Sequence, residues 1–401
     1  MRQLNIDDVD GKKIKFRPDE SKSKFRLLCE EPYWSSPKDG GHNKDVVDFS
    51  WSPCRDVRML LSASVDRTVR LWFIGTDKPC LVFKHKDIVS SVDFYPLADS
   101  SSKFLFVTGC MDKEIRLWEP YRSMEEMVGK QEPKPKKEMV GKKEQGIHED
   151  MHKQKQLVFD EPKDSVSAPE YVTSVSFRPD GKMVAAGLTR SQLMFFSHET
   201  HEEKGLRFFT QMDLKNRSGH FRHGRNVTGI KFIPKIGCEA ISSVSNSGDS
   251  ISGEGEMLVS INDSRIRLCD MEDFSVIAKV KGAQNESMQI KASVSDDGKY
   301  IISGSETGGV YIWSRDCGLR QKDKVVRNQS YSTFNATAIP GAPTVVAIFA
   351  PEAAVKKATQ INTGAYILDY TNLCARIIVT ASEGEIHVYS RGLGPDDDSS
   401  L

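Results

Sequence analysis

One short pattern recurs along this chain and limits its fold more than any other feature. Six segments end in a short apolar run, and the last residue of five of these runs is aromatic. The runs end at Trp72, Trp118, Phe196, Cys269, Trp313 and Tyr389. Six residues before each end lies a turn position, occupied by Asp66, Asp112, Arg190, Asp263, Thr307 and Glu383. A strand of small residues precedes the turn and an alternating strand lies earlier still, so each unit consists of short β-strands joined by turns.

The spacing of the units indicates how they assemble. The shortest spacings are 46 residues, from Trp72 to Trp118, and 44 residues, from Cys269 to Trp313. They are close to the roughly 40–45 residues of a four-stranded propeller blade. Such a sheet cannot bury both of its faces alone, so sheets stack around one axis and share a core. We therefore predict an all-β, closed propeller with six recognisable repeats. Its buried inner strands are expected at residues 46–51, 91–95, 172–177, 228–233, 290–295 and 345–349.

The units resemble WD repeats, also called WD40 repeats. The first unit carries Gly41-His42, a serine at position 62 or 64, Asp66 and Trp72. The resemblance implies that the His, Ser or Thr, Asp and Trp of a unit form a buried hydrogen-bonded tetrad. The residues assigned to this structural role are His42, Ser64, Asp66, Trp72, His85, Thr108, Asp112, Trp118, Asp263 and Trp313.

The first tetrad could also be interpreted as a Ser-His-Asp catalytic set made of His42, Ser64 and Asp66. A catalytic triad would occur once, whereas similar residues recur in the next unit. The structural interpretation is therefore preferred, and we predict that the protein is not an enzyme. No catalytic, cofactor-binding or metal-binding residues are assigned. The eight cysteines form no Cys-x-x-Cys pair, which leaves zinc without its usual ligand spacing.

Four further segments, at 262–268, 289–293, 303–306 and 310–313, are similar to the WD repeat-containing protein 44 family. The likeness covers about residues 41–390. It implies a cytosolic scaffold that engages a Rab GTPase of recycling endosomes and acts in vesicle traffic, with the Rab-binding region largely upstream of the propeller. The family has seven repeats. Here either the first blade is missing or residues 1–40 close the ring, and the strand for this role is expected within residues 26–34.

The expected domains are the N-terminal segment 1–40, the propeller 41–390 and an acidic tail 391–401. The propeller is interrupted at residues 121–154 by an insertion of mixed charge with two prolines, for which we predict disorder. The chain has no net formal charge, which argues against a nucleic-acid-binding surface over the whole domain. No apolar stretch of membrane-spanning or signal-peptide length occurs, so we expect a cytoplasmic protein.

A basic loop is the strongest candidate for partner binding. Residues 215–225 contain six basic side chains and no acidic residue. The assigned partner-binding residues are Arg217, His220, Arg222, His223 and Arg225. Such a loop can hold an acidic or phosphorylated peptide, and a merely solvated loop is the alternative.

The favoured function is a non-enzymatic scaffold for protein–protein interaction, with a Rab-type GTPase or an acidic or phosphorylated peptide as partner. One alternative is a substrate adaptor of a cullin-type ubiquitin ligase, although the Trp-Asp-x-Arg pattern of such adaptors is missed because Arg122 follows Trp118 one residue late. The other alternative is a nucleic-acid- or chromatin-associated propeller.

Overall fold

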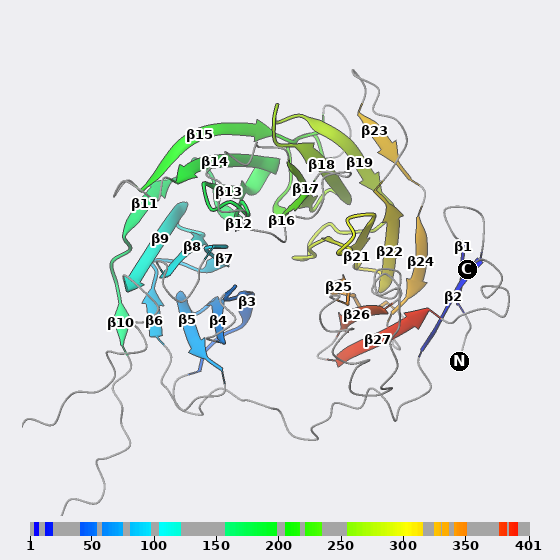
Figure 1. The fold of residues 1–401 in the computed structure, drawn as a ribbon, viewed down its shortest axis with the longest axis horizontal. Helices are drawn as coiled ribbons and strands as arrows, with labels where there is room; N and C mark the ends of the chain where they lie inside the picture. Colours follow the sequence, from blue (N-terminus) through cyan, green and yellow to red (C-terminus); the bar gives the residue numbers. More distant parts are fainter. Residues whose placement is uncertain are drawn as a thin grey trace, which may run out of the picture. The chain divides into compact units, whose positions relative to one another are not determined.

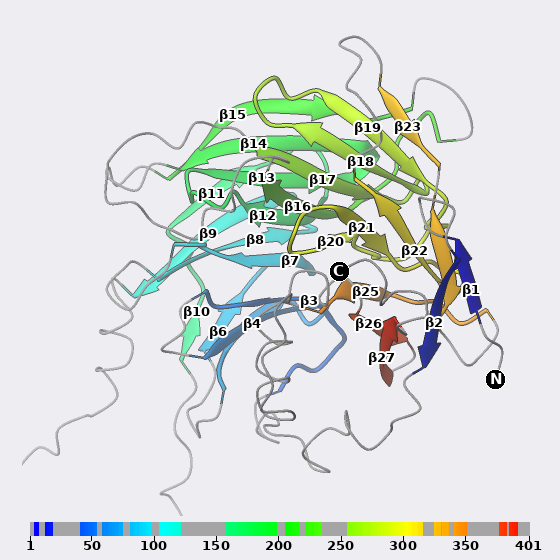
Figure 2. The ribbon, with the colours of Figure 1, turned by 45° about the vertical axis from the view of Figure 1, so that its right-hand side comes forward.

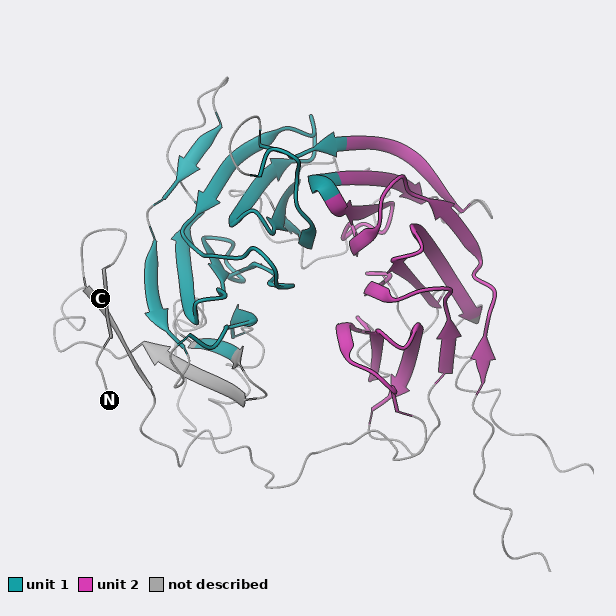
Figure 3. Ribbon diagram, turned by 180° about the vertical axis from the view of Figure 1, so that it is seen from behind, with its two compact units in different colours: residues 1–28, 190–192, 212–401 teal, residues 29–189, 193–211 magenta. Residues whose placement is uncertain are grey.

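The computed structural model divides the chain into two compact units (Figure 3). Unit 1 comprises residues 1–28, 190–192 and 212–401, and unit 2 comprises residues 29–189 and 193–211. The structure describes residues 4–7, 13–18, 41–53, 58–74, 81–97, 104–121, 157–198, 205–216, 221–234, 255–315, 325–329, 331–336, 341–350, 377–382 and 385–391. In this part of the chain the regular elements are β-strands, apart from the short 3-10 turn η1 (Thr189–Ser191).

Unit 2 contains two sheets and most of a third (Figure 1). The first is ordered β10-β6-β5-β4-β3, with β3 Val46–Trp51, β4 Met59–Ser64, β5 Thr68–Phe73, β6 Leu81–Lys84 and β10 Val158–Phe159. The second is ordered β11-β9-β8-β7, with β7 Val89–Phe94, β8 Phe104–Cys110, β9 Glu114–Tyr121 and β11 Asp164–Ser167. The third is ordered β12-β13-β14-β15, with β12 Val172–Phe177, β13 Met183–Leu188, β14 Gln192–His198 and β15 Leu206–Asp213.

Unit 1 contains three further sheets. The first is ordered β16-β17-β18-β19-β23, with β16 Val227–Pro234, β17 Gly255–Ile261, β18 Arg265–Asp270, β19 Val276–Lys281 and β23 Val326–Asn328. The second is ordered β20-β21-β22-β24, with β20 Ser293–Val294, β21 Tyr300–Ser303, β22 Gly309–Ser314 and β24 Ser332–Asn335. The third is ordered β1-β2-β27-β26-β25, with β1 Leu4–Asp7, β2 Lys13–Pro18, β25 Val346–Phe349, β26 Ile377–Ser382 and β27 Glu385–Arg391.

These sheets confirm the all-β fold and its six repeats. Each alternating segment expected as an inner strand forms, or overlaps, the strand at one end of its sheet, namely β3, β7, β12, β16, β20 and β25. Four of these strands share a register shift at their second residue, after Val46, Val89, Val172 and Val227. A bulge repeated at the same position shows that the sheets are copies of one structural unit.

The N-terminal segment supplies the outer strands of the last sheet in unit 1. Strand β2 pairs antiparallel with β27, with Phe16 opposite Arg391, and β1 pairs with β2. Residues 13–18 thus form the strand next to β27 in this sheet, and the expectation that a strand within residues 26–34 closes the ring stays a prediction. Residues 26–34 lie outside the described residues, as do 122–154 of the expected insertion and 392–401 of the tail.

Buried polar side chains tie the first strands of unit 2 together. Ser91 donates a hydrogen bond from Oγ to Asp48 Oδ2 at 2.7 Å. Asp93 accepts from Ser50 Oγ at 3.1 Å and from the Phe177 N–H at 2.9 Å. Burial raises the pKa of Asp93, while the bonds from Phe177 and Ser50 oppose this rise. The acidic residues of β3 and β7 thus link each strand to its neighbour instead of facing solvent.

Strand β3 departs from the expectation that all inner strands are buried. Phe49 is 61% exposed and Trp51 is 56% exposed, whereas Phe94 and Phe177, at the position of Trp51 in β7 and β12, are buried. Strands β7 and β12 each pack against the preceding sheet, whose residues belong to the same hydrophobic cluster. Among the described residues of unit 2, no sheet precedes β3 to cover it.

Candidate functional site

The first candidate site is the tetrad of the β3–β6 sheet. His42 precedes β3, and Asp66 lies in the turn between β4 and β5. His42 Nδ1 lies 2.9 Å from Asp66 Oδ2, and His42 Nε2 lies 2.7 Å from Ser62 Oγ. Trp72 Nε1 donates to the same Ser62 hydroxyl at 2.8 Å. Three of the four residues assigned to this tetrad are thus brought together.

The fourth member is Ser62, which corrects the assignment of Ser64. Ser64 is the last residue of β4, and its hydroxyl serves the turn: it donates to the Lys44 carbonyl at 3.2 Å and accepts from the Asp66 N–H at 3.1 Å. The spacing to the turn Asp could have distinguished the two serines, because Thr108 lies four residues before Asp112 just as Ser62 lies four before Asp66.

The arrangement of Ser62, His42 and Asp66 follows the order of contacts in a serine hydrolase, but its setting is structural. The side chains of His42 and Asp66 are 5% and 7% exposed, and Ser62 is buried under the indole N–H of Trp72. Burial lowers the pKa of His42 although Asp66 opposes this shift. Burial alone would raise the pKa of Asp66, but bonds from Thr68 and His42 outweigh it and hold this pKa at about 2.

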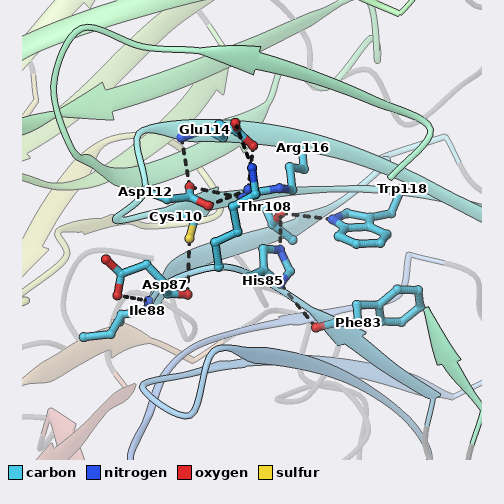
Figure 4. A network of polar contacts seen from close by, with 11 residues as sticks. Phe83, His85, Asp87, Ile88, Thr108, Cys110, Asp112, Glu114, Arg116 and Trp118 are labelled. Atoms are coloured by element: carbon cyan, nitrogen blue, oxygen red, sulfur yellow. Dashed lines mark hydrogen bonds and ion pairs between the residues drawn. The ribbon is translucent and has the colours of Figure 1, made fainter. Parts of the chain in front are cut away.

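In the β7–β9 sheet only three of the four assigned residues meet (Figure 4). His85 Nε2 lies 2.9 Å from Thr108 Oγ1, which also accepts from Trp118 Nε1 at 3.1 Å. The Asp112 carboxylate instead accepts hydrogen bonds from Arg116, at 3.1 Å through Oδ1 and at 2.5 Å through Oδ2. The assigned tetrad is therefore a triad here, since the guanidinium is the stronger, charge-assisted donor for the carboxylate.

Asp263 and Trp313 serve different contacts in unit 1. Asp263 accepts from Arg267 at 3.0 and 2.6 Å, and the two side chains are 2% and 0% exposed. Asn216 Nδ2 donates a hydrogen bond to Asp263 at 2.7 Å. Asn216 lies in the loop that precedes β16, just as His42 lies before β3. Trp313 Nε1 donates to the Lys281 carbonyl at 2.8 Å. Sequence reasoning missed Asn216, Arg116 and Arg267, although an arginine four residues after the turn Asp recurs in three units.

The buried His85 predicts a loss of stability in acid. Burial, with Arg116 nearby, lowers the pKa of His85 to about 3, whereas an unfolded histidine titrates near about 6.5. Between these two pKa values only the unfolded chain binds a proton at His85. The free energy of unfolding is therefore highest above the unfolded pKa and falls as the pH drops below it. We expect a loss of about 1–2 kcal/mol at about pH 5 relative to neutral pH. His85→Gln should reduce this drop in urea unfolding, and an unchanged drop would contradict the assignment.

The basic loop, residues 215–225, is the second candidate site, and η1 holds both of its ends in unit 1. Leu214 donates its N–H to the Ser191 carbonyl at 2.8 Å. At the other end the Arg225 N–H donates to Ser191 Oγ at 2.9 Å, and the Ser191 N–H donates to the Arg225 carbonyl at 2.6 Å. Gly224 has φ +82° and lies so close to the backbone of Arg190 that a Cβ would be 2.3 Å from its carbonyl oxygen. Glycine is therefore required at this turn.

The described part of the basic loop contains three of the five assigned partner-binding residues, and two of them, Arg222 and His223, contact each other. The Arg225 guanidinium lies over the Phe221 ring at 5.0 Å from its centroid. Arg222 Nε donates to His223 Nε2 at 3.1 Å, and both side chains are exposed. Lys215 pairs with Asp213 at 3.1 Å. Arg217 and His220 lie outside the described residues.

In the described part of the chain, no three His, Cys, Asp or Glu side chains are grouped as a metal centre requires. Cys110 and Cys269 are buried free thiols, and burial raises their pKa to about 11 and about 12. No helix in the described ranges is long and apolar enough to cross a membrane.

Comparison with known proteins is consistent with this repeat structure. The family model of the WD domain, G-beta repeat, matches residues 36–72, 77–119 and 281–314. The chain is 32% identical over 345 residues to WD repeat-containing protein 44 of Xenopus laevis, which covers 86% of this chain and 29% of that protein. An uncharacterized WD repeat-containing protein of Schizosaccharomyces pombe is 29% identical (68% of this chain, 36% of that protein). The Denticleless protein homolog of Danio rerio is 25% identical (68% and 38%). The chain thus spans about a third of the length of these relatives.

Proposed function

The chain is a WD40-repeat protein, and from this premise we propose that it is a protein-interaction scaffold whose basic loop binds an acidic or phosphorylated segment of a partner protein. The observation that carries the proposal is the anchored positive charge of residues 215–225, in which Lys215 pairs with Asp213 but Arg222 and His223 are exposed. The loop has no acidic residue of its own, and the contacts of η1 fix both of its ends. A basic surface held in place loses little entropy when an anion binds.

The exposed basic side chains of the loop are available to a partner and are not required to neutralise buried acids of the fold. Arg222 and His223 contact each other and are exposed, so neither is needed to satisfy a buried acid. Arg225 is held over Phe221, which leaves its planar guanidinium in a fixed orientation. Arginine in a fixed orientation forms bidentate hydrogen bonds with carboxylate or phosphate oxygens.

Replacement of Arg217, Arg222 and Arg225 by alanine tests the proposal. We expect the triple variant to fold, since surface substitutions change stability by about 0.5 kcal/mol or less each, and to lose the partners that the wild type captures. Wild-type binding should weaken as salt rises, because exposed charges are screened over about 8 Å at physiological ionic strength. A control with Lys86, Lys182 and Lys299 replaced by alanine loses the same charge elsewhere and should keep the partners. If the loop variant keeps every partner, the basic loop is only a solvated surface.

The resemblance to WD repeat-containing protein 44 supports a narrower form of the proposal. In this form the partner is a Rab-type small GTPase, and the chain is cytoplasmic and peripheral on endosomal or other vesicle membranes. Residues 262–268 and 289–293 carry the resemblance beyond a generic repeat. Purified Rab GTPases loaded with a GTP analogue or with GDP provide the test, and binding is expected to the GTP-analogue form. Suppose that an acidic partner binds through the loop but no Rab GTPase binds in the GTP-analogue or the GDP form. The scaffold proposal would then hold, and the Rab GTPase would be rejected as the partner.

A further inference from the structure

The outer edges of the sheets differ in how they are protected. Two sheets take a fifth strand in parallel orientation: β10 pairs with β6, and β23 pairs with β19. Two others end in short strands, β11 and β24, which expose only small polar side chains at Ser165, Ser167, Thr333 and Asn335. Short, polar edge strands are a common way to prevent unwanted pairing.

Strand β15 has neither form of protection. It is eight residues long, it is the last strand of its sheet, and no described strand pairs with its outer edge (Figure 2). Phe208 and Phe209 are each 54% exposed. Phe208 packs edge-on against Phe196 of β14, with ring centroids 6.2 Å apart. Because side chains alternate along a strand, Phe209 lies on the opposite face.

The backbone of β15 offers hydrogen-bonding groups at this edge. The Arg207 carbonyl accepts from Ser197 of β14, so it faces inward. The Leu206 N–H donates at 2.6 Å to Asp164 of a different sheet, so it faces away from β14. Alternation along the strand then directs the N–H and C=O groups of Phe208 and Thr210 to the free edge.

The filled edge of β6 shows which chemistry such an edge binds. The Val82 N–H donates to the Leu157 carbonyl at 3.0 Å, next to β10. Phe159 of the added strand stacks on Phe83 with centroids 5.0 Å apart. The acidic Asp160 that follows it lies 3.5 Å from Lys84. In this pair the added strand thus contributes a backbone bond, an aromatic side chain, and an acid next to a basic residue of the edge strand.

We propose that the outer edge of β15 binds an extended segment of another protein as a fifth, parallel strand, with an acidic residue directly before its alternating apolar side chains. On β6 the basic residue Lys84 follows Phe83, and the acid of the added strand likewise follows its aromatic residue. On β15 the basic residue Arg207 precedes Phe208, so the acid of a parallel bound segment precedes its apolar side chains. The aromatic rings of Phe208 and Phe209 then pack against its side chains on both faces of the sheet. This surface is independent of the basic loop.

Fluorescence anisotropy with a labelled synthetic peptide tests the proposal. The probe has one glutamate followed by alternating valine and phenylalanine, and its matched control has N-methyl groups on alternate backbone nitrogens. We expect the wild type to bind the first peptide and not the second, because N-methylation removes donors to the edge. Thr210→Pro removes an outward N–H, which an edge strand tolerates, and it should weaken binding by about ten-fold or more. Arg207→Glu should weaken it as well, and Thr333→Lys on β24 should not.

Three results would overturn the proposal. Equal binding by the N-methylated peptide or by a Thr210→Pro variant with a wild-type circular dichroism spectrum would show that no strand is added. A wild-type dimer in sedimentation that Thr210→Pro converts to a monomer would show that a second copy occupies the edge. Probe binding that is detected only after deletion of residues 122–156 would show that the chain's own insertion occupies it.

Discussion

Replacement of Trp118 by alanine is expected to lower the free energy of unfolding by about 3–5 kcal/mol, the range for deletion of a large aromatic side chain from a core. Trp118 is 2% exposed, and its ring lies 5.2 Å from that of Phe83 and 6.1 Å from that of Phe106, measured between centroids. Its indole N–H also donates to Thr108, so truncation leaves both a cavity and a hydroxyl without this donor. Equilibrium urea unfolding followed by circular dichroism measures the change.

Trp51 provides the matched control for this experiment. It is the same residue type at the end of β3, but it is 56% exposed. Trp51→Ala should change stability by about 0.5 kcal/mol or less, as surface substitutions do. A loss below about 1 kcal/mol for Trp118→Ala, or equal losses for both variants, would contradict the assigned core, since a residue of this size cannot leave a packed interior at so small a cost.

The second large effect is expected at Arg267. Arg267→Met leaves the Asp263 carboxylate buried, with Asn216 and the more distant Arg265 as its remaining side-chain donors among the described residues. Removal of one partner from a buried ion pair costs about 3–5 kcal/mol. Unfolding by urea at neutral pH measures this loss.

Two comparisons isolate this ion pair. Arg265 also approaches Asp263, at 3.3 Å, but its side chain is 26% exposed, so Arg265→Met should cost less than about 1 kcal/mol. The double variant Asp263→Leu/Arg267→Met removes both charges and should recover part of the loss, because an apolar pair of similar volume can replace a buried ion pair. If the double variant is no more stable than Arg267→Met, the loss of stability comes from altered packing and not from the unpaired charge of Asp263.

The sequence predicted the repeat well because its signals are local. An aromatic residue six positions after a turn residue marks the end of a strand whatever surrounds it, and Trp72, Trp118 and Trp313 are buried at these positions. The hydrogen-bond partners within each unit were harder to predict. Ser62 and Ser64 lie two residues apart in one strand, and the general pattern accepts either serine, whereas the structure shows that Trp72 donates to Ser62.

The partner of each turn Asp and the contacts between sheets were not predicted. Asp112 pairs with Arg116 and Asp263 with Arg267, whereas Asp66 contacts His42 although Arg70 lies at the same spacing, so the pattern does not decide the partner of the turn Asp. The exposure of Phe49 on β3 depends on whether another sheet covers that face, not on the residue itself. Likewise, the free edge of β15 becomes evident only when the outer strands of the other sheets are known.

The most direct test of the scaffold proposal reverses the charge of the basic loop. Biolayer interferometry should compare the wild type with Arg222→Glu/His223→Glu, using the partner captured most strongly by the wild type, at about 50 and about 300 mM salt. The proposal predicts that wild-type affinity falls as salt rises and that the reversed variant does not bind, while Lys182→Glu/Lys299→Glu binds as the wild type does. Equal affinity of the wild type and the loop variant at both salt concentrations would contradict it.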